Sequence, residues 1–252
     1  MFNKTEAEII QKYKNATNRL VLLDYDGTLV NYTIKPDTAR LPEHTFDILI
    51  DFLDDPKTKI YIITGRRQVD IDRLLNHIPI DIIAEHGAMI KEKGIWRKQL
   101  VDNFPWKNEI IPILNRFTVK CPGSFVEEKI FSIAWHYRNA DPEMGYADSR
   151  EIIDLLRRIT DSRNLKILDG KKVVEILTKD TGKGRAVKKL IEQNSFDFVL
   201  SIGDDATDEE MFEYLLPNPD AFTIKVGEGS TYARHKVKNI GDVVTILKLL
   251  LR

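Results

Sequence analysis

Five short apolar segments of this sequence each end at a polar or glycine-containing stretch, and this recurring pattern limits the fold more than any other feature. The segments are residues 20–23, 59–63, 81–84, 196–202 and 221–226. Because their apolar residues form continuous runs, they are typical of strands that are buried on both faces. Helical patterns separate them, at about residues 45–53, 68–76, 183–193 and 209–214. Buried strands that alternate with helices predict an α/β fold, a Rossmann-like doubly wound parallel sheet covered by helices on both faces.

The middle of the sequence follows a different pattern. Strand-like stretches at residues 125–137, 165–168 and 173–177 surround a helical stretch at about residues 149–159. A Phe-Pro-Trp sequence at Phe104 marks the expected start of this region, and residues 178–182 form its expected end. We therefore expect residues 104–182 to form an inserted α+β cap domain, and residues 1–103 and 183–252 to form the core. Further helices are expected at residues 4–17 and 243–251.

Composition and charge exclude several classes of protein. The chain of 252 residues carries 38 Lys and Arg residues against 39 Asp and Glu residues, whereas proteins that coat nucleic acids usually have a strong basic excess. No apolar run approaches the roughly 20 residues that span a bilayer. Residues 1–19 do not resemble a signal peptide, and a single cysteine, Cys121, fits a reducing compartment. We expect a cytoplasmic protein that binds neither nucleic acid nor membranes.

The first apolar segment ends in Asp24-Tyr25-Asp26-Gly27-Thr28. In parallel sheets, ligands bind at the carboxyl ends of the strands, so these two carboxylates are candidates for chemistry. A carboxylate serves as a metal ligand, a nucleophile or a proton shuttle. A turn capped by Asp is the structural alternative, but the complete DYDGT sequence directly after a buried strand favours a functional role.

Two further segments supply candidates for binding an anion. Thr64-Gly65-Arg66 follows the second apolar segment, where a hydroxyl group and backbone N–H groups at a helix N-terminus form an anion-binding site. Lys183 begins a predicted helix and can reach a phosphate or pair with a carboxylate. Helix capping by Thr64 and an ordinary surface position for Lys183 are the structural alternatives.

A second acidic cluster, GDDATDEE at residues 203–210, follows the fourth apolar segment. Acids at the start of a helix suit its dipole, which accounts for residues 208–210 better than for Asp204. Repulsion among Asp24, Asp26, Asp204 and Asp205 is costly without a cation, and oxygen ligands favour Mg²⁺. The sequence lacks the Cys and His spacing of a zinc site.

In this order, the four motifs resemble those of the haloacid dehalogenase-like phosphohydrolases. The resemblance implies that Asp24 attacks phosphorus and forms an aspartyl-phosphate, and that Asp26 protonates the leaving oxygen and later activates water. It also implies that the phosphoryl group is held by Lys183 together with Thr64, Gly65 and Arg66. The implied Mg²⁺ ligands are Asp24, the backbone carbonyl of Asp26, Asp204, Asp205 and Asp208.

The cap region carries a second set of polar residues. Alternation along a strand predicts that Glu127, Lys129 and Phe131 share one face of a sheet, where Glu and Lys can hydrogen-bond sugar hydroxyls. From spacing alone, the alternative is an ordinary cross-strand ion pair, worth at most about 1 kcal/mol.

Four segments of the sequence together resemble the trehalose-6-phosphate phosphatases. They are the stretch that contains Glu127 and Lys129, HYR at residues 136–138, GKKVVEI at residues 170–176 and KGRA at residues 183–186. The resemblance extends from about residue 20 to residue 227. It implies that Glu127, Lys129 and Glu175 contact the sugar. His136 and Arg138 also match, as substrate-binding residues or as residues that brace the cap. The matching Glu85-His86-Gly87 sequence leaves His86 either near the junction of core and cap or in a structural role.

The implied activity is Mg²⁺-dependent hydrolysis of trehalose 6-phosphate to trehalose and phosphate, the last step of trehalose biosynthesis. One alternative is a phosphatase for another sugar phosphate, such as sucrose phosphate or a glycosyl-phosphoglycerate, and a phosphotransferase shares the same motifs. A non-catalytic module of a synthase is disfavoured, because Asp24, Asp26 and Lys183 are all present. The implied partners are a sugar phosphate and a trehalose-6-phosphate synthase domain or protein.

Overall fold

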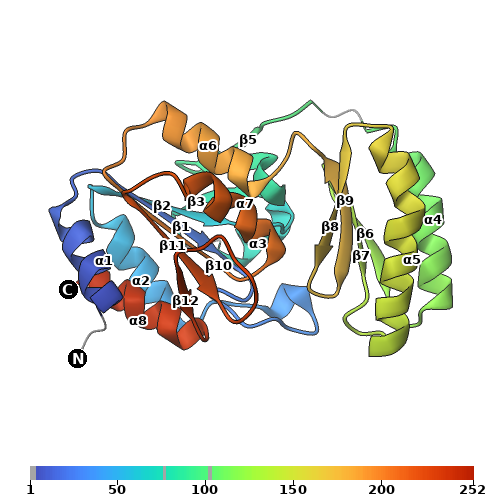
Figure 1. Ribbon diagram of the computed structural model, residues 1–252, viewed down its shortest axis with the longest axis horizontal. Coiled ribbons are helices and arrows are strands. Elements are labelled where there is room, and N and C mark those ends of the chain that lie inside the picture. The colour runs from blue at the N-terminus through green and yellow to red at the C-terminus, as the bar shows by residue number, and fades with distance from the viewer. Residues whose placement is uncertain (1–3, 76–77, 102–103) are drawn as a thin grey trace. The chain divides into compact units, whose positions relative to one another are not determined.

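The computed structural model describes residues 4–75, 78–101 and 104–252, and it divides into two compact units (Figure 1). We call the residues up to Arg97 together with Lys183–Arg252 the core unit, and Lys98–Gly182 the cap unit. Each unit contains its own sheet and its own helices. The predicted helix end at Asn76 and the predicted domain boundary at residue 103 lie outside the described residues.

The core unit is built on an eight-stranded sheet in which β1 (Arg19–Asp24) is central and entirely buried. Its neighbours β2 (Thr58–Ile63) and β10 (Phe198–Gly203) both run parallel to it. Beyond β10 lie β11 (Ala221–Val226) and β12 (His235–Val237); beyond β2 lie β3 (Asp81–Ala84), β4 (Met89–Glu92) and β5 (Ile95–Lys98). Pairing is parallel from β12 to β3, and β4 runs antiparallel to β3.

Helices cover both faces of this sheet, as expected for strands that are apolar on both sides. On one face, α6 (Lys183–Gln193) and α7 (Ala206–Leu215) pack against a cluster that includes Leu20, Tyr61 and Val199. On the opposite face, Phe198 contacts Tyr13 of α1 (Lys4–Asn15), which also packs against Phe52 of α2 (Glu43–Leu53). Helix α8 (Ile240–Leu250) packs against α1 and α2, and α3 (Gln68–Leu74) follows β2.

The strand register places the ends of β1, β2 and β10 at one edge of the sheet. Leu23 of β1 lies opposite both Ile62 of β2 and Ile202 of β10. Three polar residues follow this row within two positions: Asp24, Thr64 and Asp204. The fold therefore brings together side chains that lie far apart in the sequence.

The cap unit contains a four-stranded antiparallel sheet with the order β6-β7-β9-β8. Its strands are β6 (Phe125–Glu128), β7 (Ser132–His136), β8 (Leu165–Gly170) and β9 (Val173–Thr178). Trp135 and Ile176 on one face pack against α4 (Lys107–Lys120) and α5 (Pro142–Asp161). Because side chains alternate along a strand, Glu127 and Glu175 lie on the opposite face.

The predicted fold class is confirmed, with some differences in the individual elements. The single strand-like stretch at residues 125–137 is a hairpin of β6 and β7, and α7 begins three residues before its predicted start at Glu209. Helix α4 was not predicted, since Pro112 lies inside it; the short strands β4, β5 and β12 were also missed. None of the helices in the described ranges has the length and apolar character needed to cross a bilayer.

Candidate active site

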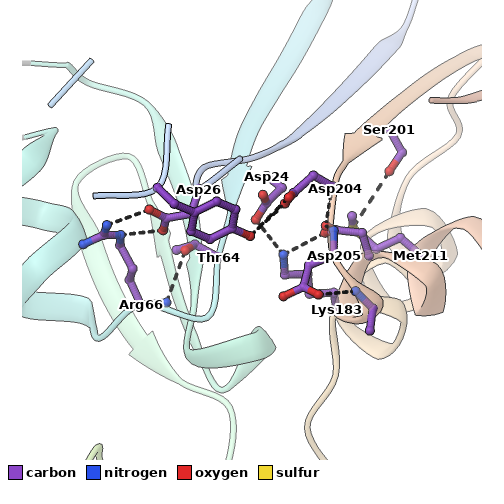
Figure 2. Close-up of polar contacts among 12 residues, drawn as sticks. Asp24, Asp26, Thr64, Arg66, Lys183, Ser201, Asp204, Asp205 and Met211 are labelled. Atoms are coloured by element: carbon purple, nitrogen blue, oxygen red, sulfur yellow. Dashed lines mark hydrogen bonds and ion pairs between the residues drawn. The ribbon is translucent and has the colours of Figure 1, made fainter. Parts of the chain in front are cut away.

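Three carboxylates and one lysine meet at the carboxyl ends of β1 and β10 (Figure 2). Asp24 ends β1, Asp204 follows β10, Asp208 lies in the first turn of α7, and Lys183 begins α6. One oxygen from each acid lies within 4.8 Å of the other two. All four residues are buried, with exposures of 5% or less. The structure thus brings together four residues that the sequence analysis selected from three separate motifs.

Lys183 joins two of these acids. Its Nζ atom donates hydrogen bonds of 2.7 Å to Oδ1 of Asp24 and of 2.7 Å to Oδ1 of Asp208. Burial alone lowers the pKa of Lys183, but Asp208 and Asp24 outweigh burial and raise it above its ordinary value. Gly184 permits this arrangement, since a β-carbon there would lie 2.5 Å from the carbonyl oxygen of Glu210 in α7. Lys183 is therefore a buried ammonium group and not a surface lysine.

Asp208 also holds the turn that carries Asp204. Its Oδ2 atom accepts hydrogen bonds of 2.9 Å from the backbone N–H groups of Asp204 and Asp205. The side chain of Asp205 accepts from the N–H of Ala206 and caps α7. Within the described part of the chain, the converging acids are Asp24, Asp204 and Asp208, and Asp205 and Asp26 are not among them.

The charge balance of this cluster favours a bound cation. Burial, followed by Asp208, raises the pKa of Asp24 well above its ordinary value, although Lys183 acts in the opposite direction. Three acids thus lie close together, and Lys183 pairs with two of them, Asp24 and Asp208. Carboxylate oxygens are the ligands that Mg²⁺ prefers, so the donor set fits a hard divalent cation.

A tight turn at Gly27 brings the DYDGT segment into close contact with Asp204. Gly27 has a φ of 85°, in the left-handed region that favours glycine, and a β-carbon there would lie 2.2 Å from Oδ2 of Asp204. The hydroxyl of Tyr32 donates to both oxygens of Asp204, at 3.2 Å each. Tyr32 was not predicted as a site residue, because it lies outside the recognised motifs and no residue pattern indicates its contact.

Asp26 forms a separate ion pair with Arg66. Nε and Nη2 of Arg66 donate to the two oxygens of Asp26 at 2.6 and 2.7 Å, and Nη1 donates to the carbonyl of Pro36 at 2.7 Å. Figure 2 shows Arg66 and Asp26 pointing toward each other, on the opposite side of Asp24 from Lys183. In this structure the guanidinium of Arg66 thus holds Asp26.

Thr64 and Gly65 lie in the loop between β2 and α3. Thr64 is 1% exposed, and its hydroxyl accepts a hydrogen bond of 3.2 Å from the backbone N–H of Arg66. Thr64 does not cap α3, whose N-cap residue is Arg67. Gly65 lies against the ring of His86, where a β-carbon would come within 2.5 Å of the ring atoms Cε1 and Nε2.

The cap unit holds a second polar cluster. Glu127 and Glu175 both lie opposite Ala134 of β7, so they share one face of the sheet. Oε1 of Glu175 accepts hydrogen bonds of 2.8 Å from Lys129 and 2.5 Å from Ser132. Ser132 was not singled out from the sequence, although its place two residues before Ala134 puts it on the same face.

Glu127 pairs with His136, whose Nε2 lies 2.8 Å from Oε2 of Glu127. Burial alone raises the pKa of Glu127, but the hydrogen bond from His136 and the charge of Lys129 outweigh burial and lower the pKa below its ordinary value. Arg138 is exposed and donates to the carbonyl of Lys171 at 2.6 Å.

The prediction that Glu127, Lys129 and Phe131 share one strand face is wrong. Strand β6 ends at Glu128, and Lys129 lies in the turn that leads to β7. Phe131 is 1% exposed and packs against Phe104. Alternation does not continue through a hairpin turn, so Lys129 reaches Glu175 from the turn.

Comparison with protein families and known proteins gives consistent results. A model of the trehalose-phosphatase family matches residues 22–240. A bifunctional trehalose-6-phosphate synthase/phosphatase from Thermoproteus tenax is 39% identical over 239 residues, which cover 94% of this chain and 32% of that protein. Alpha,alpha-trehalose-phosphate synthase (UDP-forming) B from Dictyostelium discoideum is 37% identical over 249 residues, covering 96% of this chain and 31% of that protein.

A solved structure is similar along nearly its whole length. The C-terminal domain of trehalose-6-phosphate phosphatase from C. albicans superposes with a TM-score of 0.93 at 28% identity, covering 98% of this chain and 96% of that one. By contrast, the chain spans about a third of the length of the two curated relatives, at 31% and 32%.

Proposed function

The chain belongs to the trehalose-phosphatase family, and we propose that it hydrolyses trehalose 6-phosphate to trehalose and inorganic phosphate, the last step of trehalose biosynthesis. One observation carries the proposal: Lys183 pairs with Asp24 and Asp208, beside Asp204, in a single buried site. That arrangement supplies a nucleophile, a fixed positive charge and further acids where a phosphoryl group needs them.

The reaction proceeds in two steps through Asp24. In the first, a carboxylate oxygen of Asp24 attacks phosphorus, the bond from phosphorus to the sugar oxygen breaks, and Asp26 donates a proton to that oxygen. In the second, water attacks phosphorus, the bond to Asp24 breaks, and Asp26 accepts a proton from the water. A covalent intermediate divides one difficult hydrolysis into two easier steps, and the proton makes the sugar oxygen a better leaving group.

Arg66 fixes the orientation of Asp26 in this structure, because it donates one hydrogen bond to each carboxylate oxygen. A phosphate dianion that arrives near Thr64 and Gly65 offers Arg66 another anionic partner. We propose that substrate binding draws Arg66 toward the phosphoryl group and releases Asp26.

Asp24, the backbone carbonyl of Asp26 and Asp204 would hold Mg²⁺, and Asp208 and Asp205 would support this site through the turn at the start of α7. When bound, the ion reduces the repulsion between an anionic nucleophile and an anionic phosphate. The buried ammonium group of Lys183 also reduces the repulsion between the anionic nucleophile and the anionic phosphate, and Thr64 holds a phosphoryl oxygen.

The polar cluster of the cap unit recognises the sugar. Glu127, Lys129 and Glu175 offer charged hydrogen-bonding groups to sugar hydroxyls, and His136 orients Glu127. Arg138 binds the backbone at Lys171 and braces the sheet. This set favours trehalose 6-phosphate over a monosaccharide phosphate, because the second glucose adds hydroxyls that the buried charged groups can bind.

A trehalose-6-phosphate synthase, as a separate protein or in the same chain, supplies the substrate. The Thermoproteus tenax relative carries both activities in its name. The buried, unpaired Cys121 agrees with a reducing compartment such as the cytoplasm.

A substrate panel tests the proposal. Purified protein with Mg²⁺ is offered trehalose 6-phosphate, glucose 6-phosphate and sucrose 6-phosphate, and released phosphate and free sugar are both measured. The proposal expects a kcat/KM for trehalose 6-phosphate at least tenfold above the other two, and phosphate and trehalose in equal amounts. Equal turnover of all three, or transfer of the phosphoryl group to an added sugar, contradicts it.

A further inference from the structure

We infer that His86 is a positioning residue, whose imidazole ring fixes the phosphate-binding loop, residues 64–66, by filling the space beside Gly65. The inference rests on the proposed function, which assigns this loop to the phosphoryl group. None of the steps derived above uses His86.

The backbone around His86 adopts an uncommon conformation. Glu85 and His86 have φ angles of 48° and 55°, so two consecutive residues other than glycine are left-handed. They belong to the 3₁₀ turn Glu85–Gly87 after β3, and their exposures are only 2% and 5%. Such conformations persist where the surrounding structure imposes them, and they occur often at functional sites.

This turn is tied to the loop at two points. The backbone N–H of Glu85 donates to the carbonyl of Arg66 at 3.0 Å, and that of His86 donates to the carbonyl of Thr64 at 3.1 Å. The two bonds flank Gly65. The left-handed turn thus directs consecutive N–H groups at the two residues on either side of the glycine.

The ring of His86 completes the contact at Gly65. Its Cε1 and Nε2 atoms take the place that a β-carbon of residue 65 would need, at 2.5 Å. The loop can approach the ring only because residue 65 is glycine, and the ring in turn limits how far the loop can move. The turn also packs against α6, the helix that begins with Lys183.

Movement of Gly65 is transmitted to the groups that the reaction uses. Thr64 precedes the glycine and offers its hydroxyl, while Arg66 follows it and holds Asp26. Loss of the ring is therefore expected to weaken phosphate binding through Thr64 and Arg66, with a smaller effect on the chemical step through Asp26, because Asp24 and Lys183 belong to β1 and α6 and not to this loop. Misplacement by about 1 Å costs up to roughly 100-fold in rate.

Paired substitutions at the two contacting positions test the inference. His86→Gly removes the ring and accepts the left-handed backbone, and it is expected to raise KM and the inhibition constant of inorganic phosphate about tenfold, with a smaller change in kcat. Gly65→Ala places a methyl group where the ring lies and is expected to lower kcat/KM about 100-fold.

In Gly65→Ala/His86→Gly the methyl group has room, so kcat/KM recovers at least tenfold over Gly65→Ala. His86→Asn, which tolerates the left-handed conformation, gives intermediate values.

A matched control separates the ring from the backbone. Lys93 is also left-handed, with a φ of 50°, but it is exposed and lies in the turn between β4 and β5. Lys93→Gly is expected to leave KM, kcat and the phosphate constant unchanged, and urea unfolding establishes that each variant is folded. Unchanged constants in His86→Gly, or a double variant no better than Gly65→Ala, overturn the inference. Absence of phosphatase activity in the wild-type protein overturns the proposed function, and the inference falls with it because it rests on that function.

Discussion

Nζ of Lys183 lies 2.7 Å from Oδ1 of Asp24, although 159 positions separate the two residues in the sequence. Both residues are buried, with exposures of 2% and 5%. Loss of Lys183 from this buried pair is costly, because it leaves Asp24 and Asp208 without a compensating charge, whereas Lys183 keeps Asp208 when Asp24 is replaced. The pair therefore links the proposed nucleophile to the fold of the core unit, and loss of Lys183 is expected to affect both activity and stability.

Replacement of Lys183 by Met tests this link. The variant keeps a similar side-chain length but leaves Asp24 and Asp208 without their ammonium partner. Phosphate release from trehalose 6-phosphate is expected to fall by about 100-fold to 1,000-fold. The free energy of unfolding in urea is expected to fall by about 3 kcal/mol. Lys188→Met, at an exposed position on the same helix, is the matched control and is expected to retain both. Full activity in Lys183→Met contradicts the assigned role.

The pKa of Asp24 predicts how stability depends on pH without a cation. In the folded state this pKa is raised, so between the ordinary and the raised value the folded chain binds a proton that the unfolded chain releases. In chelator, this group therefore makes the wild type less stable as pH rises through that range. Asp24→Asn removes the titration, and at pH 7 in chelator it is expected to melt at a higher temperature than the wild type.

Magnesium is expected to reverse the order of the melting temperatures of the wild type and Asp24→Asn, which thermal unfolding measures. Added Mg²⁺ is expected to stabilise the wild type more than Asp24→Asn, because the variant lacks one of the proposed anionic ligands. A variant that is less stable than the wild type in chelator at pH 7, or that gains as much from Mg²⁺, contradicts the account of this cluster.

The hydroxyl of Tyr32 is expected to strengthen metal binding by orienting Asp204. The hydroxyl donates to both oxygens of Asp204, and loss of a group that orients a metal ligand typically weakens binding 10-fold to 100-fold. Tyr32→Phe is expected to raise the dissociation constant of Mn²⁺, measured by electron paramagnetic resonance, by about tenfold. Tyr146→Phe, at an exposed position on α5, serves as the control. Unaltered Mn²⁺ binding in Tyr32→Phe shows that the hydroxyl does not orient Asp204 for the metal.

The cap cluster makes a separate prediction about substrate choice. Glu175→Gln weakens the pair with Lys129 and removes a negative charge from the cluster that is proposed to bind sugar hydroxyls. It is expected to lower kcat/KM about tenfold or more for trehalose 6-phosphate, and less for p-nitrophenyl phosphate, which has no sugar. Glu143→Gln, exposed at the start of α5, is the control. Equal losses on both substrates would remove the cluster from sugar recognition.

The sequence predicted the core well where burial dictates the residue pattern. The strands at residues 20–23 and 59–63 are apolar on both faces, because helices cover both sides of the sheet, and such runs are visible without a structure. The polar residues at the strand ends were predicted for the same reason, since a parallel sheet aligns those ends at one edge. Helix α7 starts earlier than predicted, because the reciprocal cap formed by Asp205 and Asp208 adds a turn of polar residues.

Contacts that depend on tertiary placement were not predictable. No pattern indicates that Tyr32 reaches Asp204 or that Arg66 holds Asp26, since each pair is brought together by loops. In the cap unit, residue alternation indicated the wrong position for Lys129, because the hairpin turn interrupts the strand. Its partner Glu175 lies 46 positions away in the sequence and is defined only by the strand order β6-β7-β9.

The most direct measurement is phosphate release from trehalose 6-phosphate by the wild type and Asp24→Asn, each with excess chelator and then with Mg²⁺ restored. Only the wild type is expected to release phosphate, chelator is expected to stop the release, and Mg²⁺ is expected to restore it. Release that continues in chelator, or that proceeds at a comparable rate in Asp24→Asn, contradicts the claim that Asp24 reacts with the phosphoryl group at a cation site.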